Sequence, residues 1–186
     1  MARLFVSVDI PGSLDHELRR LQNQLDNTNA DLNIVSLDKI HITLKFLGDT
    51  DPDRVDEIEN VMKDSVKNID PFDVDLDGVG VFPARDYITV VWAGVSRGTN
   101  PLTEIHRNLE EKLVERELAD PEDHDFTPHA TLARMKSGRG KSEIHDFLDK
   151  NNDRSLGIFT LNTIQLMKSN LKSNGPQYSV VKQIQL

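Results

Sequence analysis

Two histidines in this chain each begin the same four-residue pattern, His-x-Thr-Leu. The first copy occupies residues 41–44 and the second occupies residues 129–132. Given the 6 histidines among 186 residues, two copies by chance would be expected on the order of once in a thousand random orderings, which is well below the usual false-positive rate of short motifs. The repetition, and neither histidine alone, is therefore the signal that indicates chemistry.

Side chains two residues apart lie on the same face of a β-strand. If both copies form strands, His41 shares a face with Thr43, and His129 shares a face with Thr131. Two such strands facing each other would bring two imidazoles and two hydroxyls to one cleft. A neutral imidazole can take a proton from water while an imidazolium protonates a leaving oxygen, and an ordinary histidine pKa of about 6.5 makes both forms available.

Displacement at phosphorus suits such a pair, because the attacking and leaving oxygens lie on opposite sides of the phosphorus atom. The two threonines could donate to the remaining oxygens, and Arg134 could add a bidentate guanidinium. This chemistry requires neither a metal ion nor a covalent intermediate. Strict alternation from His129 places Arg134 on the opposite face, so its role requires a β-bulge or the end of the strand just after Leu132.

Structural explanations compete with this one. A lone histidine on a strand is usually a packing residue, and threonine is a common strand former. A zinc site made of His41, His129 and His124 is a further alternative, but the usual spacing of zinc ligands is absent, and we predict no metal and no cofactor. The other three histidines fall on expected helices, where packing or surface positions are the simplest interpretation: His16, His106 and His145.

The elements that must position the two patterns follow from the hydrophobic periodicity. Strands are expected over residues 3–10, 39–47, 72–76, 87–92, 129–132, 158–167 and 178–184. Helices are expected from an N-cap at Ser13 to about Leu25, over 52–66, from an N-cap at Asn100 through Leu113, and over 141–149.

Each half of the chain thus reads strand, helix, strand, helix, strand, and His-x-Thr-Leu falls on the second strand of each half. This repetition predicts a duplicated α+β fold with two lobes, in which two antiparallel sheets face a central groove. No linker rich in proline, glycine or serine separates the halves. We therefore expect one two-lobed domain over residues 1–186.

The charge distribution limits the classes of binding partner that the sequence allows. The formal net charge of −9 argues against a general nucleic-acid coat protein, since non-specific affinity comes mainly from cations that neutralise phosphates. It remains compatible with an enzyme that grips one RNA terminus. Residues 110–125 hold eight acids, whereas residues 134–141 hold four cations and no acid. If this cationic loop lies along the groove it would contact upstream phosphates; otherwise it is solvated surface.

The sequence contains no cysteine, which excludes disulfides, thiolate metal sites and cysteine nucleophiles. The N-terminal apolar run is interrupted by Asp9 and Pro11, and no run approaches the length needed to span a bilayer. We expect a cytoplasmic protein and, by default, a monomer.

Five segments resemble the two-histidine phosphoesterases, specifically the RNA 2',3'-cyclic phosphodiesterases that are also described as 2'-5' RNA ligases. They are residues 3–11 (RLFVSVDIP), 41–48 (HITLKFLG), 80–83 with 90–94, 128–134 (PHATLAR), and 169–171 with 175–178. These segments are spread from one end of the chain to the other, so the resemblance extends over nearly the whole chain.

The resemblance implies a bilobal α+β fold and metal-independent hydrolysis of RNA 2',3'-cyclic phosphate ends to 2'-phosphomonoesters. It also implies reversible, ATP-independent joining of RNA ends through a 2'-5' linkage. By this resemblance His41 protonates the leaving 3' oxygen and His129 activates water, while Thr43, Thr131 and Arg134 hold the phosphate. The expected partners are RNAs that end in a 2',3'-cyclic phosphate, tRNA fragments among them.

Two other functions remain open from the sequence. One is a non-catalytic module that binds RNA termini with the same cleft and the 134–141 loop. The other is a phosphodiesterase for a different cyclic phosphate, such as ADP-ribose 1'',2''-cyclic phosphate. The presence of both histidines favours an enzyme, because a binding module needs neither an acid nor a base.

Overall fold

The computed structural model describes residues 2–172 and 175–186. Its strands are β1 (Ala2–Asp9), β2 (Leu32–Ile34), β3 (His41–Thr50), β4 (Phe72–Ala84), β5 (Tyr87–Val95), β6 (His129–Met135), β7 (Ser155–Leu161), β8 (Thr163–Lys172) and β9 (Gly175–Gln185). Its helices are α1 (Asp15–Asp26), α2 (Val55–Val66), α3 (Thr99–Glu115) and α4 (Lys141–Asn151), with short 3-10 turns η1 (Gly12–Leu14), η2 (Leu37–Lys39) and η3 (Pro52–Arg54).

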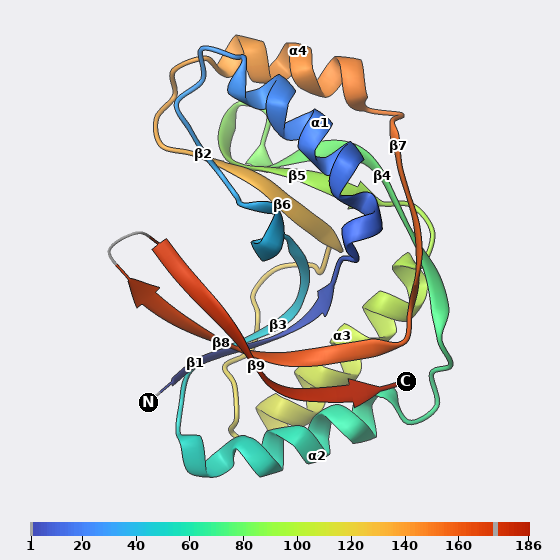
Figure 1. Cartoon of the computed structure of the whole chain (residues 1–186). Helices are drawn as coiled ribbons and strands as arrows, with labels where there is room; N and C mark the ends of the chain where they lie inside the picture. The colour runs from blue at the N-terminus through green and yellow to red at the C-terminus, as the bar shows by residue number, and fades with distance from the viewer. Residues whose placement is uncertain (1, 173–174) are drawn as a thin grey trace.

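The strands form two arms that meet where the two His-x-Thr-Leu strands lie side by side. One arm has the strand order β9-β8-β1-β3 and the other has the order β6-β5-β4-β7, with β2 added beside β6. Within the described residues one pair, Ile42 opposite Ala130, joins β3 to β6. The two expected sheets are therefore the arms of one curved antiparallel sheet, and the predicted two-lobed α+β fold is confirmed (Figure 1).

The helices are exchanged between the arms. Helix α1 follows β1 in the chain but packs with α4 against the arm of β4 and β6, whereas α3 follows β5 but packs against β3. Helix α2 lies against α3 and β9 (Figure 1). The two halves of the sequence thus interlock, and each arm buries its helix-covered face with elements from both halves. Among the described residues, no helix is both long enough and apolar enough to cross a membrane.

Both N-cap predictions were wrong. Ser13 lies inside η1, where the Leu14 amide donates to the Pro11 carbonyl at 3.0 Å, so α1 begins only at Asp15. Asn100 lies inside α3, which begins one residue earlier because Gly98 adopts a left-handed φ of 89° and caps the helix. In both places the backbone turn begins the helix, and the polar side chain does not.

The expected strand over 158–167 is two strands. The chain leaves β7, which pairs with β4, and crosses at Asn162 into β8, which pairs with β1 and β9. One connection therefore links the outer edge of one arm to the other arm. The three residues of β2, which lie in a polar stretch without a strand prediction, pair with β6 and place Asn33 opposite Arg134.

Candidate active site

A β-bulge lies at the same place in both histidine strands. In β3, Thr43 and Lys45 pair with adjacent residues of β1, so Leu44 is an extra residue. His41 and Thr43 are partly exposed on one face, and Leu44 and Lys45 are both buried. Alternation then resumes, and Phe46 returns to the face of His41. We call this side of the sheet the histidine face.

In β6, Thr131 and Ala133 pair with adjacent residues of β5, so Leu132 is the extra residue. This is the irregularity that strict alternation required for Arg134. Leu132 and Ala133 are buried, and Arg134 is exposed on the side of His129 and Thr131. From this side, the positive charge of Arg134 lowers the pKa of both His41 and His129.

Backbone carbonyls fix the tautomer of both imidazoles. His41 Nδ1 donates to the Lys39 carbonyl at 2.8 Å, and His129 Nδ1 donates to the Thr127 carbonyl at 2.7 Å. Because a carbonyl oxygen only accepts, Nδ1 carries a hydrogen in each ring and Nε2 is the atom that gains or loses a proton. His41 Nε2 lies 3.0 Å from the Thr43 hydroxyl.

Burial lowers the pKa of both histidines, because desolvation disfavours the charged imidazolium. The carbonyl partners act in the opposite direction, and the charge of His129 lowers the pKa of His41 further. Asp9, which is opposite His41 in the pairing of β1 with β3, raises it. The two imidazoles therefore interact, and an anion bound between them would favour protonation of one.

Aromatic rings flank each histidine. The His41 ring centroid lies 5.0 Å from that of Phe5 and 5.5 Å from that of Tyr178, which it meets edge-on. The His129 centroid lies 4.8 Å from Phe82 and 6.0 Å from Trp92. These rings restrict the orientation of the imidazoles and exclude water from one side of each. No pattern in the sequence gave the four rings a role, because their meeting depends on pairing between distant strands.

A cavity of about 500 Å³ lies beside His129 and Thr43. Its walls come from both arms and from the loop between α3 and β6. They include Thr43 and Phe46 from β3, Phe82 from β4, and His129, and the loop adds residues 122 and 124–127. A small ligand could therefore lie against both His-Thr strands at once.

A buried lysine anchors that loop. Lys45 is 1% exposed, and its Nζ lies 2.6 Å from Glu110 Oε2 and 3.3 Å from Glu122 Oε1. It also donates to the Asp120 carbonyl at 2.8 Å, and the Glu122 amide donates to Glu110 Oε1 at 2.8 Å. Burial acts to raise the pKa of Glu110, but its contacts with Lys45 and the Glu122 amide outweigh burial and lower the pKa. We call these four residues the Lys45 cluster.

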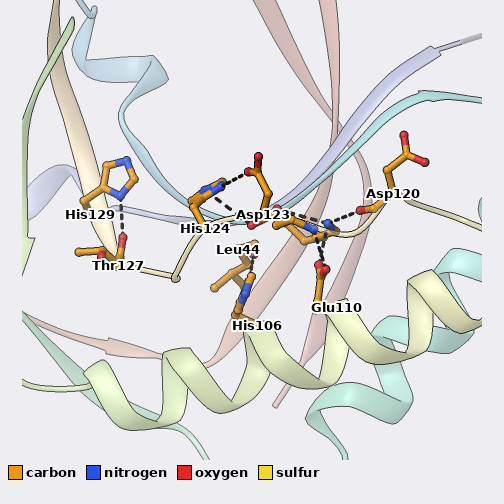
Figure 2. A network of polar contacts seen from close by, with 10 residues as sticks. Leu44, His106, Glu110, Asp120, Asp123, His124, Thr127 and His129 are labelled. Carbon is orange, nitrogen blue, oxygen red and sulfur yellow. Dashed lines mark hydrogen bonds and ion pairs between the residues drawn. The ribbon is translucent and has the colours of Figure 1, made fainter. Parts of the chain in front are cut away.

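His106 provides the second anchor (Figure 2). Its Nδ1 donates to the carbonyl of the bulge residue Leu44 at 2.7 Å, and its ring stacks on Phe126 with centroids 4.2 Å apart. Phe126 directly precedes Thr127, the residue that accepts from His129. The bulge of β3 thus supports the loop that orients the histidine of the other arm. The packing interpretation of His106 was right, but the sequence did not indicate what it supports.

The structure brings the five residues singled out from the sequence to one face: His41, Thr43, His129, Thr131 and Arg134. His124 lies on the cavity loop, is exposed, and contacts the carboxylate of Asp123. In the described parts of the chain, no group of three or more His, Cys, Asp or Glu side chains is arranged to hold a metal ion. The cationic loop after β6 is partly engaged, since Lys136 pairs with Asp31.

The chain is similar to known proteins along nearly its whole length. The sequence profile of the 2'-5' RNA ligase superfamily matches residues 10–172. A curated relative from Methanocaldococcus jannaschii, described as an RNA 2',3'-cyclic phosphodiesterase, is 34% identical over 181 residues, which is 97% of this chain and 99% of the relative. A relative from Methanothermobacter thermautotrophicus with the same description is 31% identical over 179 residues and covers 95% of both chains.

Solved structures share the fold. A crystal structure of a protein from Thermus thermophilus matches with a TM-score of 0.80 and 24% identity, over 99% of this chain and 97% of that one. The crystal structure of Escherichia coli LigT in complex with 3'-AMP matches with a TM-score of 0.80 and 19% identity, over 100% of this chain and 98% of that one.

Proposed function

The chain belongs to the 2'-5' RNA ligase superfamily, and from this premise we propose that it is an RNA 2',3'-cyclic phosphodiesterase. It opens the cyclic phosphate at the end of an RNA and leaves a 2'-phosphomonoester. The descriptions of its full-length relatives support this activity. The chemistry is acid–base catalysis by the two histidines and uses no metal ion.

In the proposed reaction, a water molecule on the side of His129 attacks phosphorus and gives its proton to His129 Nε2. The bond from phosphorus to the 3' oxygen breaks on the opposite side, and His41 Nε2 gives its proton to that oxygen. The proton count balances, and the histidines end with their protonation states exchanged. Thr43, Thr131 and Arg134 donate to the oxygens that carry the developing charge.

The observation that carries the proposal is the matched fixation of the two rings. Each Nδ1 is held by a backbone carbonyl two residues before the histidine, which leaves each Nε2 to transfer protons. A binding module would gain nothing from fixing the same tautomer at both positions. Arg134, whose charge acts on both rings, adds the cation that a phosphate between them requires.

The same arrangement supports 2'-5' ligation. The 5' hydroxyl of a second RNA would replace water as the attacking group, give its proton to His129, and displace the 3' oxygen. The product is a 2'-5' phosphodiester, and no ATP is consumed because the cyclic ester bond supplies the driving force. Ligation and hydrolysis should then be lost together in any variant that lacks either histidine.

A test compares three substrates with excess EDTA present: a nucleoside 2',3'-cyclic phosphate, an oligonucleotide with the same end, and ADP-ribose 1'',2''-cyclic phosphate. We expect turnover of the first two with a higher kcat/KM than for the third. Binding without turnover would assign the chain to the RNA-terminus modules. Turnover restored only by added zinc or manganese would contradict the metal-independent reaction.

We further propose that the substrates include tRNA fragments with cyclic phosphate ends, and that the protein acts as a cytoplasmic monomer. The absence of cysteine supports a reducing compartment. Sedimentation analysis of the purified protein tests the monomer, since a dimer would sediment at about twice the mass.

A further inference from the structure

The proposed reaction gives the two arms different positions along the substrate. In an in-line displacement the attacking water and the leaving 3' oxygen lie on opposite sides of phosphorus. The 3' oxygen is part of the ribose, and the ribose is joined to the rest of the RNA. If His41 protonates that oxygen, the ribose and the upstream nucleotides lie on the side of His41, and water enters on the side of His129.

We propose that the nucleotides upstream of the cyclic phosphate bind over the histidine face of β1, β8 and β9, which we call the β8–β9 face. This inference rests on the proposed function and adds the path that the RNA takes away from the reacting phosphate. The ligand is single-stranded RNA, held by contacts of its bases with apolar and aromatic side chains.

The charge distribution favours this face. All 31 Asp and Glu residues of the sequence lie before residue 155, whereas residues 155–186 hold none and carry three lysines. Strands β8 and β9 lie wholly within this acid-free segment. In a chain with a net charge of −9, a polyanion meets the least repulsion there. Lys168 lies opposite Ser179 and Lys182 lies opposite the buried Leu166, both on the other face of the sheet, and Lys182 is paired with Asp56 and Glu59. The absence of acids, and not added lysine charge, therefore favours the β8–β9 face.

Strand pairing shows which residues make up the face. Phe5 lies opposite Met167, and Met167 lies opposite Val180. The ring of Phe5 contacts those of both His41 and Tyr178, so the face is continuous with the catalytic site.

Apolar side chains in the outer part of this face are open to solvent, whereas Phe5, beside the histidine, is only 3% exposed. Val180 is 53% exposed, and Leu171, farther out on the same hairpin, is 72% exposed. Arg3 lies opposite Ser169 on the same side and adds a cation. Contact of bases with aromatic and apolar surfaces, beside a few cations, is the usual mode of sequence-tolerant binding of single strands. The nearby acids are Asp9, at His41, and Asp49, opposite Arg3.

The other two routes are less suited to RNA. The cavity beside His129 is walled by Glu122, which is already paired with Lys45, and by Asp125, whose carboxylate repels phosphates. The cationic loop, residues 134–141, begins in the last two residues of β6, at the opposite end of the strand from His129. Two of its lysines are already engaged: Lys136 lies 3.4 Å from Asp31, and Lys141 donates to the Asp86 carbonyl.

A pair of neighbouring substitutions tests the proposal. Val180→Glu places a negative charge on the β8–β9 face, and Ser179→Glu places the same charge one residue away on the opposite face of the strand. The measured quantity is the ratio of KM for a single-stranded oligonucleotide with a 2',3'-cyclic phosphate end to KM for the matching nucleoside. We expect Val180→Glu to raise this ratio about tenfold, the loss of one stacked base, and Ser179→Glu to leave it within about twofold.

Three results would overturn the proposal. One is an unchanged ratio for Val180→Glu in a protein with a wild-type circular dichroism spectrum. Another is an equal rise for both variants, which would indicate a long-range charge effect. The third is a rise for the triple variant Lys136→Ala, Arg139→Ala, Lys141→Ala instead, which would place the RNA on the cationic loop. Absence of nucleoside turnover in the wild type would contradict the proposed function itself and is thereby distinguishable.

Discussion

Strands β3 and β6 begin with the same four-residue pattern and differ at the two positions that follow it. Each has a histidine, a threonine two residues later and a bulge at the fourth position. After the bulge, β3 continues with Lys45 and Phe46, and β6 continues with Ala133 and Arg134. The repeated part places two imidazoles with the same tautomer on one face, and these are the acid and the base of the proposed reaction. The residues that follow the bulge make the two arms unequal.

The different residues after the bulge give the two arms different roles. Arg134 returns to the histidine face and brings a cation to both imidazoles, whereas its counterpart Phe46 is 62% exposed and uncharged. Lys45 faces the other way, is buried, and ties down the loop that leads to His129. Its counterpart Ala133 is buried without charge. In the proposed reaction, one arm therefore supplies the cation for the phosphate, and the other arm supports its partner's histidine.

The largest effect on activity is expected at the two histidines, which occupy equivalent positions in the two strands. His41→Ala and His129→Ala should each lower kcat for a nucleoside 2',3'-cyclic phosphate by roughly 10²–10⁴-fold, because each removes one proton transfer. Both act in one displacement step, so the double variant should be far less than multiplicatively worse. Steady-state kinetics with a circular dichroism control measures this. Near wild-type turnover in either single variant would end the acid–base assignment.

The next largest effect on kcat is expected at the equivalent positions where the two strands differ, Arg134 in β6 and Phe46 in β3. Arg134→Ala should lower kcat by about 10²-fold, comparable to the loss of one donor to a developing negative charge. The matched variant Phe46→Ala, at the equivalent position of β3, should change kcat for the nucleoside by less than about threefold, since it removes no charge from the reaction. If the two variants prove equally active, Arg134 does not contact the reacting phosphate.

The third prediction concerns the contribution of the Lys45 cluster to the stability of the fold. Lys45→Met should destabilise the fold by about 3 kcal/mol, because removal of the buried lysine leaves two partly buried carboxylates unpaired. Glu110→Gln should relieve part of this loss, so the double variant Lys45→Met, Glu110→Gln should be more stable than the sum of the single changes predicts. Chemical denaturation measures both effects. Simple additivity would show that the Lys45 cluster does not act as a unit.

The smallest effect is a shift along the pH axis. One histidine must be neutral, so activity falls as pH drops through its pKa. The other must be protonated, so activity falls as pH rises through its pKa. Burial lowers both pKa values, so both limbs of the bell-shaped kcat/KM profile should lie below about 6.5, the ordinary histidine value.

The variant Arg134→Ala provides a second test based on the pH profile of kcat/KM. Removal of the guanidinium takes away a charge that lowers both pKa values, so both limbs should move to higher pH. A wild-type profile that rises steadily to high pH would instead indicate hydroxide or a different base.

Much of this architecture could be predicted because it is local. The two-residue alternation around His41 and His129 identified the strands and the face, and the apolar stripes identified the four helices. Because Arg134 would otherwise point away from His129, alternation also required either a bulge or the end of the strand just after Leu132, and the structure has the bulge. The N-caps at Ser13 and Asn100 failed because backbone turns next to a proline and a glycine begin those helices.

The rest depends on contacts between distant segments. The exchange of α1 and α3 between the arms, and the joining of the arms through one residue pair, follow from packing that no local pattern encodes. Lys45 reads as a surface lysine in the sequence, and only the bulge turns it inward onto Glu110 and Glu122. The rings of Phe5 and Tyr178 are 173 positions apart in the chain and meet at His41.

The proposed reaction requires that water attack phosphorus and that the bond from phosphorus to the 3' oxygen break without a metal ion, and isotope labelling tests these requirements. An oligonucleotide with a 2',3'-cyclic phosphate end is hydrolysed in ¹⁸O-labelled water with excess EDTA, and the product is analysed by mass spectrometry and phosphorus NMR. We expect a 2'-phosphate that carries one ¹⁸O, because water enters beside His129 and the 3' oxygen leaves beside His41. A 3'-phosphate product, or no product until a metal ion is added, would contradict the proposed reaction.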